Sequence, residues 1–234
     1  HSFMKGTDFY LGRQPMMQEI VLTDDGWIRF KTGQTTKTKQ KTPFGTSVKL
    51  QNVFYDDFSS AVLNPGWTGS IQSYRQRPMP SGGSLLLPSA AQGAGEYSSA
   101  LSRRPSSADY NYETHMACGG NSLRGLAYIS NAANMVVFGT ERGKLVIRQV
   151  KDGHASDLFA GQYDGDDIWL GISVDDVKTL RFFYSSDGKK WHSVDDLVTN
   201  VFASVRKSYY KPGIINVGHG DSNATFYEFK MTDK

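Results

Sequence analysis

The sequence predicts an all-β protein in which two antiparallel sheets pack face to face. Apolar and polar residues alternate along several short stretches, and a period of two is typical of strands with one buried face. Turn residues separate these stretches about every 8–12 residues, the spacing expected of a β-sandwich. Few stretches show helical periodicity over more than two turns. At 234 residues, the chain has room for one large β domain or two small ones.

The clearest element is a hairpin within residues 167–194. Apolar and polar residues alternate along Ile168–Val174, and the alternation continues along Thr179–Tyr184. Between these strands, Asp175–Lys178 forms a short polar connection, and Ser186–Lys189 then turns the chain again. We therefore expect two adjacent antiparallel strands followed by a second tight turn.

Short stretches bounded by turn residues predict further strands across residues 48–234. These strands are Asn52–Phe58, Ser84–Leu87, Tyr97–Leu101, Asp109–Ala117, Arg124–Ser130, Asn134–Thr140, Lys144–Val150, Ala155–Gln162 and Ala224–Met231. In the last of them, strict alternation assigns Tyr227, Phe229 and Met231 to one face. A short helix is predicted over Leu197–Ser204.

Residues 1–33 differ in character from the rest of the chain. Met16–Leu22 is apolar enough for a strand, and Thr23–Trp27 is a compact turn that ends in a large aromatic residue. An isolated hairpin is marginally stable in water, so this segment should pack on something else. Residues 34–47 are polar and basic, as is typical of a linker, and they leave residues 48–234 for the sandwich.

Composition and motifs exclude several classes of function. The net charge is only +3, and the basic run Lys37–Lys41 lacks interleaved aromatic residues, so we expect no nucleic-acid partner. No apolar run approaches the ~20 residues of a membrane span, so we expect no membrane partner. The sequence has no Gly-x-Ser-x-Gly elbow, no phosphate-binding glycine loop after a strand and no Cys/His metal spacing. Esterase, kinase and zinc-site interpretations are thereby removed.

Cys118 is the only cysteine, so no intrachain disulfide can form. A nucleophilic cysteine would need a positioned histidine, and His115, three residues away, would lie on the opposite face of a strand. We interpret Cys118 as a buried small hydrophobe. The sequence opens at His1 without an initiating methionine or an apolar leader, so we expect a processed product or a piece of a longer protein. A periplasmic or extracellular location is favoured over a cytoplasmic one.

Two blocks of the sequence resemble one known family. The first block is His1-Ser2-Phe3, Leu11-Gly12-Arg13-Gln14 and Asp24-Asp25-Gly26-Trp27. It is similar to the segment that closes the five-bladed β-propeller of glycoside hydrolase family 43. The second block is Asp56-Asp57-Phe58-Ser59, Trp67, Ala100-Leu101-Ser102-Arg103-Arg104, Arg124-Gly125-Leu126 and Ala224-Thr225-Phe226-Tyr227. It resembles the concanavalin-A-like β-sandwich appended to the β-xylosidases and α-L-arabinofuranosidases of that family.

The resemblance implies a division of the chain and a set of residue roles. Residues 1–33 become the final strands of a propeller, 34–47 the linker and 48–234 the concanavalin-A-like sandwich. In the resembled family the catalytic carboxylates come from earlier propeller blades, so we assign no catalytic residue here and expect the chain to be inactive alone. The resemblance places Arg13 in the sugar-binding pocket, where a guanidinium donates several hydrogen bonds to hydroxyls. It places His1 near the propeller axis, where it helps to order a metal ion or water network.

Acidic residues suggest one further site. Asp57 opens the sandwich and Asp221 precedes its last strand, so the two carboxylates would meet if the first and last strands are neighbours. Together with backbone carbonyls they would hold a structural calcium ion. Turn capping and solvation of strand ends form the competing interpretation. The cluster Asp164–Asp167 lacks the glycine and glutamate of an EF-hand and is interpreted as a loop.

Aromatic residues allow two interpretations. Ser186–Trp191 resembles the Asp-box hairpin of carbohydrate-active proteins, a folding motif in which Asp187 accepts turn N–H bonds and the tryptophan plugs the core. A second set of side chains could supply platforms for sugar rings: Trp169, Arg181 and Phe183, together with Tyr74, Tyr128 and Tyr184. Packing inside the sandwich or against a neighbouring domain is the alternative that we favour.

The resemblance predicts the carboxyl-terminal portion of a glycoside hydrolase that acts on oligosaccharides derived from xylan or arabinoxylan. Its partners would be an upstream propeller domain and the oligosaccharide substrate, and the sandwich would support and shape the active site. The choice between xylosidase and arabinofuranosidase stays open. The alternative is a free-standing, lectin-like carbohydrate-binding module. Exposure of Trp27, Met16 and Met17 on an apolar patch would favour the first interpretation.

Overall fold

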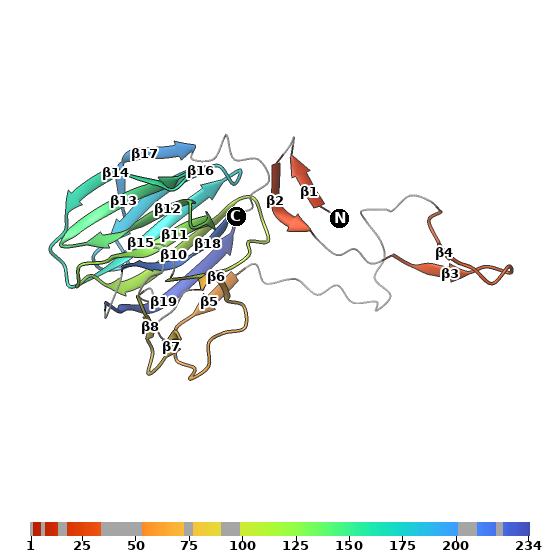
Figure 1. The fold of residues 1–234 in the computed structure, drawn as a ribbon, viewed down its shortest axis with the longest axis horizontal. Helices are drawn as coiled ribbons and strands as arrows, with labels where there is room; N and C mark the ends of the chain where they lie inside the picture. The colour runs from red at the N-terminus through yellow and green to blue at the C-terminus, as the bar shows by residue number, and fades with distance from the viewer. Residues whose placement is uncertain are drawn as a thin grey trace.

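The computed structural model describes residues 2–5, 8–13, 18–33, 53–72, 77–89, 99–200, 210–218 and 222–234. Every regular element in this described part is a β-strand, and the strands form two large sheets and two separate hairpins (Figure 1). The predicted all-β class is confirmed. No helix in these ranges is long and apolar enough to cross a membrane.

One layer of the sandwich is an eight-stranded antiparallel sheet. Its order is β17 (His192–Asn200), β16 (Thr179–Ser185), β15 (Asp167–Asp175), β10 (Tyr110–Ala117), β19 (Ala224–Asp233), β8 (Leu85–Leu87) and β7 (Met79–Pro80), and β5 (Val53–Asp56) also pairs with β19. Strands from the middle and the end of the sequence therefore lie side by side, as β10 does with β19.

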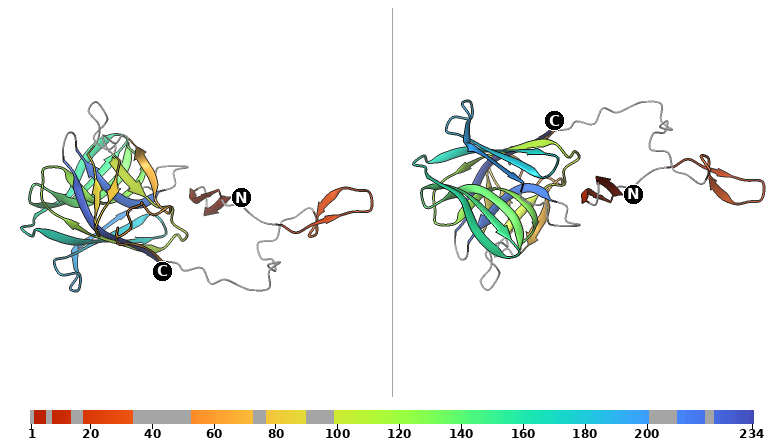
Figure 2. Two further views of the ribbon diagram at one scale, coloured as in Figure 1. Left: turned by 90° about the horizontal axis from the view of Figure 1, so that it is seen from below. Right: turned by 90° about the horizontal axis from the view of Figure 1, so that it is seen from above.

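The other layer is a seven-stranded sheet. Its order is β14 (His154–Gln162), β13 (Lys144–Lys151), β12 (Asn134–Glu141), β11 (Leu123–Asn131), β18 (Lys211–Val217), β9 (Ser99–Ser102) and β6 (Thr68–Gln72). The two sheets face each other as layers in Figure 2. The chain passes between them after β5, β6, β8, β9, β10, β14, β17 and β18. This arrangement confirms the predicted β-sandwich.

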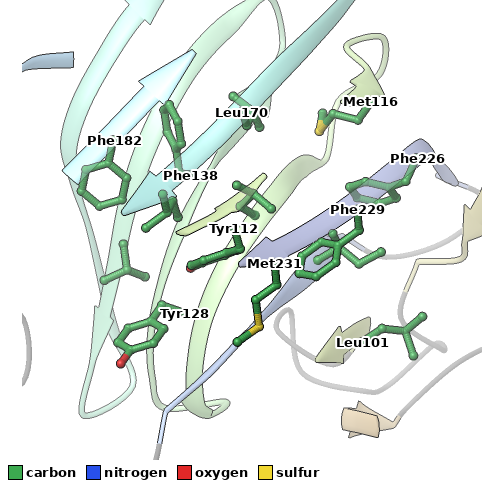
Figure 3. Packing of buried hydrophobic residues seen from close by; sticks show 14 of the residues in the cluster. Leu101, Tyr112, Met116, Tyr128, Phe138, Leu170, Phe182, Phe226, Phe229 and Met231 are labelled. Carbon is green, nitrogen blue, oxygen red and sulfur yellow. The ribbon is translucent and has the colours of Figure 1, made fainter. Parts of the chain in front are cut away.

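The main hydrophobic core lies between the sheets. Its largest side chains, including Tyr112, Phe182 and Phe229 from one sheet and Tyr128 and Phe138 from the other, are buried (Figure 3). Phe138 and Phe182 meet edge to face across the two layers, with ring centroids 5.3 Å apart. Such burial of aromatic surface is the principal stabilising contribution in a fold of this kind.

The seven-stranded sheet is apolar on both faces. Leu126 of β11 faces the main core, whereas Ala127, Ile129 and Val137 belong to a second buried cluster on the opposite face. Consecutive residues of β11 are accordingly buried instead of alternating with exposed ones. A strand covered on both faces has a continuous apolar sequence, which explains why alternation is weak there.

A pair of glycines lets β11 and β12 approach closely. Gly125 and Gly139 are paired in the register of the two strands. A Cβ atom at Gly139 would lie 1.9 Å from the carbonyl oxygen of Arg124, and one at Gly125 would lie 2.2 Å from that of Phe138. Any side chain at either position would therefore push the strands apart.

A bulge in β19 corrects one prediction. His115 pairs with Glu228, but the next residue of β10, Met116, pairs with Phe226, so β19 carries an extra residue at this point. Phe226 consequently faces the core and is fully buried, whereas Tyr227 is only partly buried. Strict alternation, which placed Phe226 and Tyr227 the other way round, is wrong here because a bulge shifts the face of every later residue.

Two local predictions are also wrong. Residues 197–200, predicted to begin a helix, continue β17, which pairs with β16 through Thr179↔Asn200; residues 201–204 lie outside the described residues. The connection at Asp175–Lys178 is not wholly polar, because Val177 is buried with a φ of 53°. Its backbone N–H donates to the carbonyl of Ala108 at 3.0 Å. In both places a distant strand or loop outweighs the local preference.

Two hairpins precede the sandwich. In the first, β1 (Ser2–Lys5) pairs with β2 (Asp8–Arg13), and in the second, β3 (Ile20–Leu22) pairs with β4 (Ile28–Phe30). The proposed linker, 34–47, and the first residues of the second domain lie outside the described residues. The predicted boundaries between domains therefore stay predictions.

Candidate functional site

The residues predicted to contact substrate or metal in the propeller are placed only in part. Arg13 is the last residue of β2, where its backbone pairs with Ser2. Its side chain, and all of His1, lie outside what the structure describes. The substrate-binding role of Arg13 and the indirect metal role of His1 therefore stay predictions.

Asp57 is engaged in a local turn. Its Oδ1 accepts hydrogen bonds from the backbone N–H of Ser59 at 3.0 Å and from the Ser59 hydroxyl at 2.6 Å. These bonds lower the pKa of the Asp57 carboxyl. Among the described residues, no group of three or more His, Cys, Asp and Glu side chains is placed to hold a metal ion. Asp221 lies outside the described residues, so the calcium site stays a prediction.

The Asp-box turn is built as predicted, with one exception. Asp187 Oδ1 accepts the backbone N–H groups of Lys189 and Lys190, both at 2.8 Å, and the Ser185 hydroxyl at 2.9 Å. These donors, Lys190 first, lower the pKa of Asp187 to about 2. Trp191, however, does not plug the core: it is 37% exposed on the outer face of the eight-stranded sheet.

The aromatic residues considered as sugar platforms separate into two groups. Tyr128 is fully buried and donates a hydrogen bond to the carbonyl of Val177 at 2.8 Å, and Tyr184 packs against the main core. Tyr128 is a core residue and Tyr184, which is partly buried, packs on the core, so both agree with the packing role that we favoured. Trp169 and Phe183 instead lie on the outer face of the sheet and are partly exposed. Tyr74 lies outside the described residues.

Trp169 anchors an ordered polar group on that face. The His115 ring stacks on Trp169 with 3.6 Å between ring centroids and 5° between planes, and His115 Nε2 lies 3.0 Å from Asp167 Oδ2. Cys118 faces the core instead, and burial raises the pKa of its thiol to about 12. The thiol is therefore protonated at neutral pH, which agrees with its interpretation as a small hydrophobe.

A row of exposed apolar side chains lies on the β3–β4 hairpin. Ile20 pairs with Phe30, and Leu22 pairs with Ile28, so these four side chains share one face of the hairpin. Their exposed fractions are 55% for Ile20, 46% for Phe30, 74% for Leu22 and 66% for Ile28. Trp27, in the adjoining turn, is 69% exposed. Met16 and Met17 lie outside the described residues.

Polar contacts hold the hairpin in shape without covering this face. In the turn, the Thr23 N–H donates to the Trp27 carbonyl at 2.9 Å, and the Arg29 guanidinium lies 3.2 Å from Asp25. At the open end, Lys31 Nζ lies 2.7 Å from Glu19. A hairpin that exposes four apolar side chains on one face is typical of an element that packs against another domain or chain through that face.

Comparisons with known proteins identify the fold. No protein-family model matches the chain, and no curated protein matches it. Among solved structures, the K247S mutant of the GH43 protein BlXynB from Bacillus licheniformis aligns with a TM-score of 0.73 and 17% identity over 93% of this chain. A xylan β-1,4-xylosidase from Bacillus halodurans aligns with a TM-score of 0.64 and 21% identity over 92%. Bacteroides ovatus xyloglucan PUL GH43B aligns with a TM-score of 0.65 and 17% identity over 92% of this chain.

The likeness covers more than nine-tenths of this chain. The chain in turn spans 46% of the length of each of these three structures. At sequence identities of 17–21%, the comparison establishes the fold. The predicted likeness to family 43 is therefore confirmed as a likeness of fold.

Proposed function

We propose that this chain is the carboxyl-terminal portion of a family 43 glycoside hydrolase that acts on oligosaccharides derived from xylan or arabinoxylan. The observation that carries the proposal is the exposed apolar face of the β3–β4 hairpin. A two-stranded hairpin is marginal in water, and this one exposes Ile20, Leu22, Ile28 and Phe30 on a single face. An upstream β-propeller would cover that face by packing its own strands on it.

The aligned structures support the proposal that this chain is one part of a longer enzyme. They share the fold over at least 92% of this chain, yet more than half of each of them lies beyond the match. Two of the three carry GH43 in their names, and the Bacillus halodurans protein is a xylan β-1,4-xylosidase. These names supply the proposed substrate class. The choice between a xylose and an arabinose unit at the cleaved bond is left to the assay below.

The chemistry assigns a supporting role to this chain. Hydrolysis of a glycosidic bond needs two carboxyl groups about 5–10 Å apart, one of them protonated at the working pH. We place both in the upstream propeller. This chain would complete the propeller, contribute Arg13 to the sugar pocket and hold the sandwich against its rim. On this proposal the chain has no hydrolytic activity alone.

The alternative is a free-standing, lectin-like module. It would need no second domain, and its apolar hairpin face should then be covered within the chain. Among the described residues, Trp27 and the four apolar residues of the hairpin face are all substantially exposed. This exposure favours the portion of a larger enzyme.

The test is complementation. The chain is assayed alone, and mixed with the proposed upstream propeller portion, against an aryl β-xyloside and an aryl α-arabinofuranoside. We expect turnover only in the mixture. Turnover by the isolated chain would refute the supporting role, and a mixture inactive on both substrates would refute the assigned reaction class.

A pair of matched variants tests the interface itself. Leu22 lies on the hairpin face and Val62 lies in the loop after β5, and both side chains are 74% exposed. We expect Leu22→Asp to abolish complementation and Val62→Asp to leave it unchanged, because only the first places a charge in the proposed interface. Both variants should keep the melting temperature of the sandwich. Equal complementation by the two variants would contradict the interface.

A further inference from the structure

A shallow groove lies on the outer face of the eight-stranded sheet, on the side away from the main core. It has a volume of about 260 Å³, and the side chains that line it are Asn111, Glu113, Ser173, Phe183 and Trp191. Strands β10, β15 and β16 supply its floor, and the Asp-box turn supplies Trp191. The residues of this groove have no role in the function proposed above.

The register of the strands creates the hollow. Phe183 of β16 pairs with Gly171 of β15, and Gly171 pairs with Glu113 of β10, so the three positions form one row across the sheet. Because Gly171 has no side chain, the row has a gap between an aromatic ring and a carboxylate. The neighbouring row, Arg181–Ser173–Asn111, continues the floor with a small hydroxyl and an amide.

Trp191 forms the aromatic wall of the groove. Its Cζ3 atom lies 3.1 Å from the position of a Cβ atom at Gly171, so the indole packs over the glycine and borders the groove. The hydrogen bonds that Asp187 accepts from Lys189 and Lys190 fix the turn immediately before Trp191. An indole that stays 37% exposed while its backbone is fixed presents a prepared apolar surface.

Contacts from two lysines order the polar side of the groove. Glu113 accepts from Lys230 Nζ at 3.0 Å, and Ser173 Oγ accepts from Lys234 Nζ at 2.8 Å. Among the described residues, no hydrogen bond is made by the exposed Asn111 side-chain amide. The floor therefore offers a carboxylate, a hydroxyl and an amide to one ligand. Lys230 is paired with Glu113, and Lys234 with Asp175.

We propose that this groove binds a neutral sugar unit of an oligosaccharide or polysaccharide. A pyranose has an apolar C–H face that fits the exposed indole of Trp191 and hydroxyls at its rim that fit Asn111, Glu113 and Ser173. The volume is below the roughly 300 Å³ at which pockets for drug-sized ligands begin, and the open shape lets a chain extend at both ends. The groove therefore contacts one or two sugar units of a longer glycan.

The charges at the groove disfavour other ligands. A phosphate backbone would require unpaired cationic side chains, whereas Lys230 and Lys234 both lie in ion pairs. A metal ion would require several ligands, and Glu113 is the one carboxylate among the lining side chains. The site is thus a contact for glycan that would hold the protein on its polymer.

The experiment measures glycan binding by the 234-residue chain without any upstream domain. The probes are xylohexaose and cellohexaose by isothermal titration calorimetry, and soluble arabinoxylan by affinity gel electrophoresis. We expect saturable binding of at least one probe. Trp191→Ala should weaken that binding tenfold or more, and Asn111→Ala should weaken it severalfold while leaving the aromatic wall intact.

Trp27→Ala is the matched control, because Trp27 is an exposed tryptophan outside the groove. It should leave affinity unchanged, and circular dichroism should show that all three variants remain folded. Absence of binding to every probe would overturn the proposal. The proposal would also be overturned if Trp191→Ala and Asn111→Ala left the affinity unchanged, or if Trp27→Ala lowered it as much as Trp191→Ala does. Since no hydrolysis is measured, this result is independent of whether the proposed enzyme activity is found.

Discussion

Asp56 should be among the most sensitive positions of the sandwich, although it lies next to the tolerant Asp57. Its side chain is 9% exposed; Oδ2 accepts the indole N–H of Trp67 at 2.7 Å, and Oδ1 accepts the backbone N–H of Phe58 at 3.0 Å. Phe58 has a φ of 54°, a left-handed conformation that is strained for a bulky residue. The Asp56 carboxylate therefore does two things: it orients the core residue Trp67, and it stabilises the unfavourable backbone conformation at Phe58.

The expected loss follows from these two bonds. A hydrogen bond to a charged group contributes about 1.5–3 kcal/mol, so Asp56→Ala should lower the free energy of unfolding by about 3–4 kcal/mol after partial relaxation. Asp56→Asn keeps one acceptor oxygen, and we expect it to cost about 1–2 kcal/mol. Asp57→Ala, which removes exposed contacts to Ser59 only, should cost much less than either Asp56 variant.

The assay is urea unfolding followed by circular dichroism, with thermal unfolding as a second measure. For a domain of this size, about 2–4 °C is lost per kcal/mol, so 3 kcal/mol corresponds to a decrease in Tm of about 6–12 °C. A double-mutant cycle with Trp67→Phe should give a coupling energy of about 1–2 kcal/mol. An Asp56→Ala variant no less stable than Asp57→Ala, or a coupling energy near zero, would refute the reasoning.

Two further predictions concern titratable groups. The folded-state pKa of Asp187 is lowered to about 2 from its ordinary 3.8, so its contribution to stability is complete above about pH 4 and disappears as the pH falls towards 2. The stability difference between wild type and Asp187→Ala, measured by thermal unfolding across pH, should therefore shrink in this window; a difference that grows on acidification would contradict it. The Cys118 thiol, whose pKa burial raises to about 12, should react with iodoacetamide at about pH 8 only after unfolding in urea. Rapid stoichiometric labelling of the native protein would show that the thiol is accessible.

Local sequence patterns determined much of the sandwich. Alternation along Ile168–Val174 predicted β15, and its even-numbered residues are indeed buried. The Ser186–Lys189 turn could be predicted together with its hydrogen bonds, because the partners of Asp187 in the described part of the chain lie within three positions of it. Features of this kind depend on neighbours in the chain, and neighbours are visible in a sequence.

Other features depended on partners distant in the chain. The β19 bulge arises from its pairing with β10, and the burial of Val177 accompanies its contacts with Ala108 and Tyr128. Trp191 lies outside the core because Gly171, twenty positions earlier in the numbering, leaves space for its ring on the outer face of the sheet.

The same distinction governs function. The sequence alone determined the β class, the turn chemistry and the resemblance that points to Arg13, and these inferences need only residue types and spacing. The tertiary structure decided that Ile20, Leu22, Ile28 and Phe30 share one exposed face. It also decided that Trp191, Ser173, Asn111 and Glu113 line one groove. Strand register brings such residues together. Register is set by pairing between strands that lie far apart in the sequence.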